Sequence, residues 1–206
     1  MKNNLTEMVF ILDRSGSMSG LEADTIGGFN SMIGKQKKED GEAFVTTVLF
    51  DTRYDVLHDR LPLEKVPAMT DKDYCVGGCT ALLDAVGAAI RQIETIHKYA
   101  RPEDVPAHTI FIITTDGHEN SSSNYSYADV KKMIVSKQEK GWEFLFLGAN
   151  IDAAAEAARI GISRDRAAEY AASECGTQSL FRAVNKSVAA VRRKGILDDS
   201  WRDELK

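Results

Sequence analysis

Three side chains that carry oxygen ligands, Asp13, Ser15 and Ser17, follow directly after an apolar run near the start of the chain. The run, residues 8–12, has the composition of a buried strand, and successive side chains on a strand point to opposite faces. The three oxygens can therefore converge only if the chain turns around one point where the strand ends. A carboxylate and two hydroxyls in such a turn form the oxygen-only ligand set that a hard cation such as Mg2+ prefers. A polar turn between a strand and a helix has the same composition, so this segment alone leaves both interpretations open.

Two further segments add a hydroxyl and a second carboxylate. Thr80 follows Gly77 and Gly78 and precedes a long amphipathic segment. Asp116 follows a second continuous apolar run, residues 110–113, and stands before a glycine. In doubly wound α/β sheets, ligands bind outside the carboxyl ends of the strands, which is where both aspartates are expected.

In this order and at these spacings, Asp13, Ser15, Ser17, Thr80 and Asp116 resemble the metal-ion-dependent adhesion site of von Willebrand factor type A domains. The resemblance extends over nearly the whole chain. It implies a Rossmann-like fold that binds one divalent ion, Mg2+, Mn2+ or Ca2+, through these five residues. It also implies a protein partner whose Asp or Glu completes the shell of the ion. Stand-alone bacterial members of the family often work beside ATPases of the AAA+ class or in stress-response assemblies, so such a partner is one expectation.

The five ligand residues leave room for an external ligand. Mg2+ requires about six oxygens at near-octahedral angles, so at least one position is expected to face solvent or a partner. The hydroxyls add no charge, and the ion therefore keeps enough Lewis acidity to bind an incoming carboxylate. The residues expected at the rim of the partner-binding surface are Arg14, Met18, His118 and Glu119. For the polar segment 118–125, an ordinary solvated loop remains the alternative.

A Mg2+-dependent hydrolase, such as a phosphoesterase with Asp13 at the metal centre, is the alternative function. Phosphatases of the haloacid dehalogenase type place two aspartates after the first strand, but Ser15 stands at the second position here. The chain has no Gly-x4-Gly-Lys-Ser/Thr phosphate loop and no Gly-x-Gly-x-x-Gly after a strand. Glu119 is the one nearby carboxylate that could act as a general base. No complete catalytic set of residues emerges, so an interaction module is expected rather than an enzyme.

Length and composition favour one domain and argue against several classes of protein. A chain of 206 residues suits a single domain, expected at 1–206 with a core at 5–193 and a C-terminal tail at 194–206. The longest apolar runs are far shorter than the roughly 20 residues that span a bilayer. A net charge of -5 argues against general nucleic-acid binding. The first seven residues lack the apolar segment of a signal peptide, so secretion by that route is not expected. The oligomeric state is not indicated.

The three cysteines, Cys75, Cys79 and Cys175, are an odd number in a domain of this size, which argues against a disulfide framework. Cys75 and Cys79 have the form of half a zinc site, but no second Cys or His pair stands at ligand spacing. Free thiols in a reducing, cytoplasmic compartment are therefore expected.

Strand and helix patterns alternate along the chain, which predicts a doubly wound α/β fold. We expect a mostly parallel sheet of about six strands with helices on both faces. One antiparallel edge strand should arise from a hairpin at Asp51 and Thr52. The strands are expected at residues 8–12, 44–50, 53–61, 109–114, 142–147 and 166–171. The helices are expected at residues 20–38, 82–96, 126–140 and 153–160, and from residue 177.

Polar residues near the expected helix starts predict how these helices are capped. Ser19 with Glu22, and Ser126 with Asp129, have the spacing of a capping box, and Thr177 is expected to cap the last helix. Gly27 and Gly28 lie inside the first expected helix, where glycine is unfavourable, and therefore indicate close packing against a neighbour.

Overall fold

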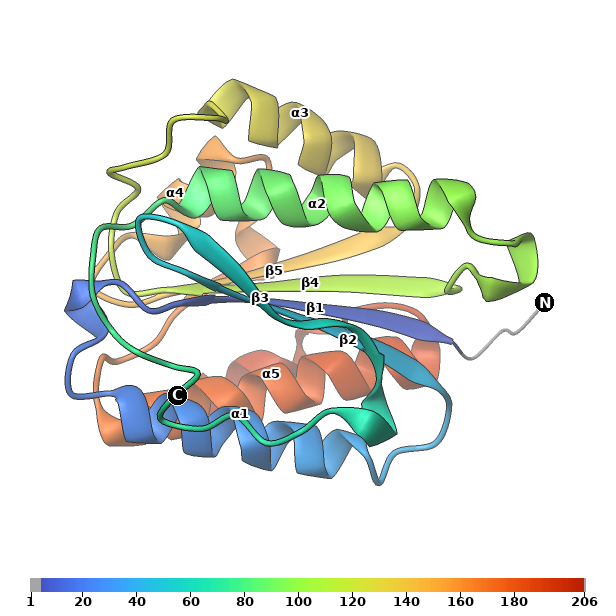
Figure 1. Cartoon of the computed structure of the whole chain (residues 1–206), viewed down its shortest axis with the longest axis horizontal. Coiled ribbons are helices and arrows are strands. Elements are labelled where there is room, and N and C mark those ends of the chain that lie inside the picture. Colours follow the sequence, from blue (N-terminus) through green and yellow to red (C-terminus); the bar gives the residue numbers. More distant parts are fainter. Residues whose placement is uncertain (1–4, 206) are drawn as a thin grey trace.

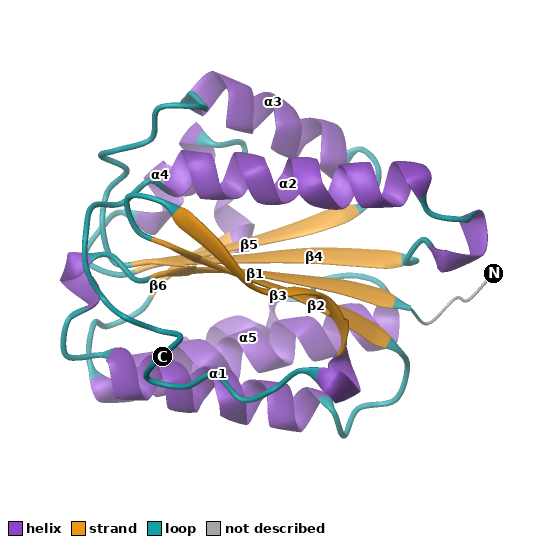
Figure 2. Ribbon diagram, viewed as in Figure 1, coloured by secondary structure: helices purple, strands orange, loops and turns teal. Residues whose placement is uncertain are grey.

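A six-stranded sheet forms the centre of the protein, as a computed structural model that describes residues 5–205 shows (Figure 2). Its strand order is β3-β2-β1-β4-β5-β6. Within the described residues only β3 runs antiparallel to its neighbour, so the expected fold class is confirmed. The strands are β1 (Thr6–Asp13), β2 (Ala43–Phe50), β3 (Tyr54–Pro62), β4 (His108–Thr115), β5 (Trp142–Gly148) and β6 (Ala167–Glu169).

Helices cover both faces of this sheet. Figure 1 shows α1 and α5 on one face and α2, α3 and α4 on the other. The helices are α1 (Glu22–Gln36), α2 (Leu82–Tyr99), α3 (Tyr127–Gln138), α4 (Ala153–Arg159) and α5 (Glu174–Lys194). Within the described residues, no helix combines the length and the apolar character that crossing a membrane requires.

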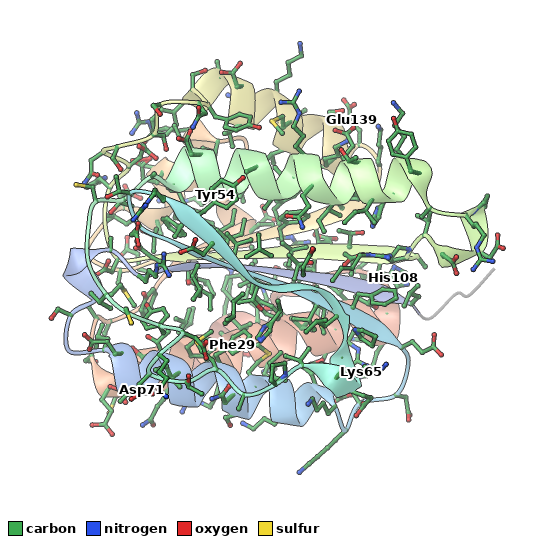
Figure 3. The ribbon with its side chains drawn as sticks, viewed as in Figure 1. Phe29, Tyr54, Lys65, Asp71, His108 and Glu139 are labelled. Carbon is green, nitrogen blue, oxygen red and sulfur yellow. The ribbon has the colours of Figure 1, made fainter. Side chains whose placement is uncertain are left out.

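The two faces of the sheet bury separate apolar cores because side chains alternate along each strand. On β1, Phe10 belongs to the core beneath α1 and α5, whereas Ile11 belongs to the core beneath α2 and α3. Phe29 of α1 lies between its helix and the sheet (Figure 3), with its ring edge-on to Phe10 at 5.5 Å. Because the central strands are buried on both faces, successive side chains along them are apolar. This explains the continuous apolar runs in the sequence.

The C-terminal segment is part of the packed domain. A 3-10 helix (Asp199–Leu205) follows α5, and Trp201 and Leu197 are buried in the core shared with α1 and α5. The core therefore extends past residue 193, where it was expected to end. The expected domain also included residues 1–4 and 206, which lie outside the described residues.

Two of the three helix caps predicted from the sequence are wrong. A short 3-10 helix (Gly16–Met18) intervenes before α1, so Leu21 is the N-cap and Glu22 accepts from the amide of Gly20 instead of forming a box with Ser19. The last helix starts three residues earlier than expected. Its N-cap is Ser173, and Thr177 lies inside the helix.

The capping box at Ser126 and Asp129 is confirmed at the start of α3. The hairpin at Asp51 is also confirmed, because the Asp51 amide donates to the carbonyl of Arg53. Both features depend on contacts within four residues, which local sequence determines well.

Candidate metal centre

The candidate centre lies where the chain changes from one face of the sheet to the other. The chain leaves β1 through α1 on one face, and leaves β4 through α3 on the opposite face (Figure 1). β1 and β4 are neighbours in parallel register, with Leu12 opposite Thr114. Asp13 is the last residue of β1 and Asp116 follows the end of β4, so both lie at this topological switch point.

Asp13 is fixed in place by hydrogen bonds to both of its carboxylate oxygens. It is 1% exposed. The amide of Ser15 donates to Oδ1 at 2.7 Å, and the hydroxyl of Thr115 donates to Oδ2 at 2.6 Å. The hydroxyl of Tyr74 donates to the backbone carbonyl of Asp13. The end of β1 is therefore held from the β4 side and from the loop that precedes α2.

The two serines connect Asp13 to Asp116. The Ser15 and Ser17 hydroxyl oxygens are 3.2 Å apart, and Ser17 Oγ donates to Asp116 Oδ1 at 2.5 Å. Asp116 is 3% exposed, and its second oxygen, Oδ2, is buried without a hydrogen-bond partner among the described residues. The structure therefore brings these side chains together from two loops.

Thr80 joins the group from a third loop. It is buried, and a Cβ placed on Gly117 would lie 3.5 Å from Thr80 Oγ1 and 3.6 Å from Ser17 Oγ, so both hydroxyl oxygens face the same point. Gly78 precedes this residue with φ of +74°, and a Cβ there would meet Thr52 Oγ1 at 2.7 Å. Only glycine fits this turn without strain. All five predicted residues thus converge.

Backbone hydrogen bonds lock the three loops together. The Gly16 amide donates to the carbonyl of Gly78 at 3.2 Å, and the Gly77 amide donates to that of Arg14 at 3.0 Å. Asn120 forms two hydrogen bonds to the backbone of Thr80. Its side-chain Oδ1 accepts from the Thr80 amide at 2.9 Å, and its backbone amide donates to the Thr80 carbonyl at 3.1 Å. The oxygens therefore stand on a rigid frame.

Both carboxylates resist ionisation in this environment. Burial raises the pKa of Asp13, against the hydrogen bonds from Ser15 and Thr115, and the charge of Asp116 raises it further. Burial also raises the pKa of Asp116, against the hydrogen bond from Ser17. These two buried, repelling carboxylates accept hydrogen bonds from hydroxyls and one backbone amide, and no basic side chain among the described residues pairs with either. A divalent cation supplies the missing counter-charge. The all-oxygen donor set and the unpartnered Asp116 Oδ2 fit such an ion.

The expected rim is wrong for Met18, which is 5% exposed and packs inward from the 3-10 helix. Arg14 is also held rather than free. Its Nε donates to Asp51 at 2.9 Å, and a second nitrogen pairs with Asp55 at the start of β3. Although burial lowers the pKa of Arg14, these two carboxylates raise it overall. Arg14 thus ties β1 to the hairpin beside the site.

Glu119 closes the start of α2. Its Oε2 accepts from the Leu83 amide at 2.9 Å and from the Ser122 hydroxyl at 2.7 Å. Its Oε1 accepts from the amides of Ser121 at 2.9 Å and Ser122 at 2.7 Å. Four donors occupy the carboxylate, so Glu119 stabilises the loop between β4 and α3 and joins it to the start of α2.

His118 is the most open of the expected rim residues, with a side chain that is 66% exposed. Its Nδ1 lies 3.3 Å from Glu156 Oε1 of α4. It therefore faces solvent and α4, at the edge of the group formed by the five oxygen-bearing residues.

Three residues around the centre were missed by sequence reasoning: Tyr74, Thr115 and Asn120. Thr115 directly precedes Asp116 at the end of a buried strand, and a hydroxyl in that position could have indicated a contact to the centre. Tyr74 acts across 61 positions of sequence, and no local pattern indicates such a contact.

The cysteines take no part in this centre. All three are exposed and free. Across residues 5–205, no group of three or more His, Cys, Asp or Glu side chains is arranged to hold a metal ion. The ligand set at the strand ends is built instead from two carboxylates and three hydroxyls.

By sequence, no protein-family model and no curated protein matches this chain. Its fold is shared with solved structures. A von Willebrand factor type A protein from Catenulispora acidiphila is 18% identical, with a TM-score of 0.59 over 90% of this chain and 42% of that one. Proximal thread matrix protein 1 from the mussel byssus, with a zinc-occupied MIDAS motif, is 15% identical, with a TM-score of 0.59 over 89% of this chain and 46% of that one.

A third structure, the manganese-loaded TRAP protein of Plasmodium vivax, is 16% identical, with a TM-score of 0.51 over 72% of this chain and 59% of that one. The chain thus spans between 42% and 59% of the length of these three proteins. It has the von Willebrand factor type A fold that its motif residues predicted.

Proposed function

We propose that this protein is a metal-dependent interaction module, which holds one divalent ion and through it binds an acidic group of a protein partner. One observation carries the proposal. Five oxygen-bearing residues from three loops, two of them buried carboxylates, converge at the switch point of the sheet, and Asp116 Oδ2 has no partner among the described residues. Two similar folds contain zinc or manganese.

The donor set favours a hard cation, and we propose Mg2+, with Mn2+ or Ca2+ as the alternatives. Asp13, Ser15, Ser17, Thr80 and Asp116 would hold the ion, directly or through water. Mg2+ suits a site with few protein ligands because it keeps several waters. When bound, the ion supplies a Lewis-acid position that a carboxylate can fill.

The protein's own residues prepare this site for an anion. The hydroxyls of Ser15, Ser17 and Thr80 add no negative charge, so an incoming Asp or Glu meets less repulsion than in a carboxylate-rich site. The partner remains a proposal from the family resemblance: a protein with an exposed acidic residue, in an AAA+ ATPase or a stress-response assembly.

Binding without turnover is proposed because the side chains around the centre offer no free base. Both carboxylates of the centre are assigned to the ion, and the carboxylate of Glu119 is occupied by four donors. General-base catalysis needs a group that can accept a proton from the nucleophile. These contacts favour an interaction module over the Mg2+-dependent hydrolase.

The test compares the wild type with Asp13→Ala. Calorimetry should show binding of Mg2+ or Mn2+ to the wild type and none to the variant, with the fold retained by circular dichroism. Capture of a partner on the immobilised protein should be abolished by EDTA. Robust hydrolysis of phosphate esters by the wild type, lost in both Asp13→Ala and Glu119→Gln, would establish the hydrolase instead.

A reducing, cytoplasmic location is also proposed, supported by three exposed free cysteines, Cys75, Cys79 and Cys175. Protein prepared rapidly from its host and denatured without reductant should react with a thiol reagent at all three positions. A consistent disulfide between any two of them would contradict this location.

A further inference from the structure

Tyr170 carries a buried hydroxyl that is not used by any contact within the described residues. The residue is 7% exposed, and its hydroxyl oxygen is buried without a hydrogen-bond partner there. An unpaired buried hydroxyl costs free energy, and native proteins rarely keep one without a reason. The other buried tyrosine near the centre, Tyr74, differs because its hydroxyl already donates to the Asp13 carbonyl.

The backbone of Tyr170 lies at the level of the candidate centre. Its backbone amide donates to the carbonyl of Gly148 at 2.9 Å. Gly148, the last residue of β5, pairs with Thr115, the last residue of β4. Tyr170 is therefore two strands from the end of β4, about 10 Å across the sheet. Between them lies Ala149, which is fully buried and whose backbone amide donates to the carbonyl of Thr115 at 2.9 Å.

The spacing along β4 puts Asp116 on the side of the sheet where Tyr170 lies. Ile110 and Ile112 of β4 lie in the core beneath α1 and α5, and Asp116 follows at the same two-residue spacing, directly after the strand ends at Thr115. Tyr170 and Ala149 belong to the same core. Tyr170 Oη and Asp116 Oδ2, two of the buried side-chain atoms without partners among the described residues, thus belong to residues at one level and on one face.

The hydroxyl can donate a hydrogen bond at neutral pH, because a tyrosine side chain ordinarily has a pKa of about 10. A protonated phenol beside a carboxylate that lacks a donor is the pairing that hydrogen-bond chemistry favours.

We propose that Tyr170 is a positioning residue of the metal centre, whose hydroxyl, unpaired in the metal-free protein, donates to Asp116 Oδ2 through one buried water when an ion is bound. The inference rests on the proposed function, since it concerns how Asp116 is oriented toward an ion. Groups that orient metal ligands in this way commonly change metal affinity by 10–100-fold. In the metal-bound protein Tyr170 would then restrain Asp116 Oδ2, while Ser17 donates to Oδ1.

Tyr170→Phe tests the inference because it removes only the hydroxyl. We expect Mn2+ affinity to fall roughly 10-fold in calorimetry. The urea midpoint of the metal-free variant should stay equal to the wild type or rise, since an unpaired buried hydroxyl has been removed. Addition of Mg2+ should change the near-ultraviolet tyrosine spectrum of the wild type, and this change should be absent from the variant. Tyr127→Phe, whose hydroxyl contacts Glu156 of α4, is the matched control and should keep wild-type affinity.

Three results would contradict the inference in different ways. Wild-type Mn2+ affinity in Tyr170→Phe would overturn the role of the hydroxyl while leaving the proposed function intact. Weaker binding accompanied by a lower metal-free urea midpoint would show that Tyr170 acts through packing alone. Absence of metal binding by the wild type itself would overturn both the inference and the proposed function.

Discussion

Asp13 and Asp116 are buried side by side in an arrangement that opposes ionisation of both. In the metal-free protein, holding both carboxylates charged costs folding free energy. A bound cation would remove this cost. The same residues therefore have opposite effects on folded stability without and with metal. The pH dependence of stability reveals this difference.

We predict that metal-free protein loses stability, relative to Asp116→Asn, as the pH rises from about 4 toward 7. The pKa of Asp116 in the folded state is raised above its ordinary value of 3.8. Its stabilising contribution is thus fully present below the unfolded pKa and is lost as the pH rises through the folded pKa. Urea unfolding in EDTA across this range measures the difference. If the wild type instead became more stable relative to Asp116→Asn as the pH rises, the raised pKa of Asp116 would be contradicted.

Asp84 of α2 anchors the loop that connects Asp116 to the start of α3. It accepts hydrogen bonds from the amides of Ser123, Asn124 and Tyr125 at 2.9–3.0 Å. Burial raises the pKa of Asp84, but these hydrogen bonds lower it overall. We therefore expect Asp84→Asn to cost about 2 kcal/mol of folding free energy at pH 7 in urea titrations.

The effect of Asp84→Asn should disappear in acid. Because the folded pKa is lowered, the contribution is present above the unfolded pKa and is lost as the pH falls through the folded pKa. Asp59→Asn removes the charge of an exposed aspartate that accepts one hydrogen bond, from Gln92, among residues 5–205, and it should change stability by less than about 0.5 kcal/mol. Equal costs for the two variants would show that Asp84 does not anchor the loop.

At the scale of elements, α1 approaches α5 most closely at one glycine of the pair Gly27 and Gly28. A Cβ on Gly28 would lie 2.2 Å from the ring of Phe181, whereas a Cβ on Gly27 would have no heavy atom within 4 Å. Phe181 is buried, so a Cβ at Gly28 would have to displace a ring of the core. The close packing that the glycine pair indicated is therefore real, but it belongs to one of the two positions.

The matched pair Gly28→Ala and Gly27→Ala should change stability in opposite directions. Gly28→Ala should lose roughly 1–3 kcal/mol through overpacking. Gly27→Ala should gain up to about 1 kcal/mol, because alanine is the better helix former and meets nothing. Thermal or urea unfolding of the two variants measures both effects. Loss of stability in both would show that α1 approaches α5 differently from this arrangement.

The elements also show which features local sequence could predict. The continuous apolar runs of β1 and β4 and the residues of the candidate centre were readable because burial and ligand chemistry leave a signature at each position. The cap at Ser19 was wrong because a 3-10 helix intervenes, and the cap at Thr177 was wrong because Ser173 lies at a better position. The burial of Met18 depends on how loops stack, and no local pattern encodes that.

At the scale of the whole molecule, the segment after α5 completes the core beneath α1 and α5. Trp201 is fully buried there, although the polar sequence around it gave no such indication. Trp201→Ala should therefore cost about 3–5 kcal/mol of folding free energy in urea titrations. Trp201→Phe keeps much of the volume and should cost clearly less. Equal, near-zero effects would mean that the segment is not part of the folded domain.

The proposed function depends on one ion at the ends of β1 and β4. The most direct measurement is an anomalous difference map from a crystal of the protein soaked in Mn2+. We expect one strong peak among the oxygens of Asp13, Ser15, Ser17, Thr80 and Asp116, and its loss in crystals of Asp13→Ala. A well-ordered wild-type centre without a peak, or a peak that persists in Asp13→Ala, would contradict it.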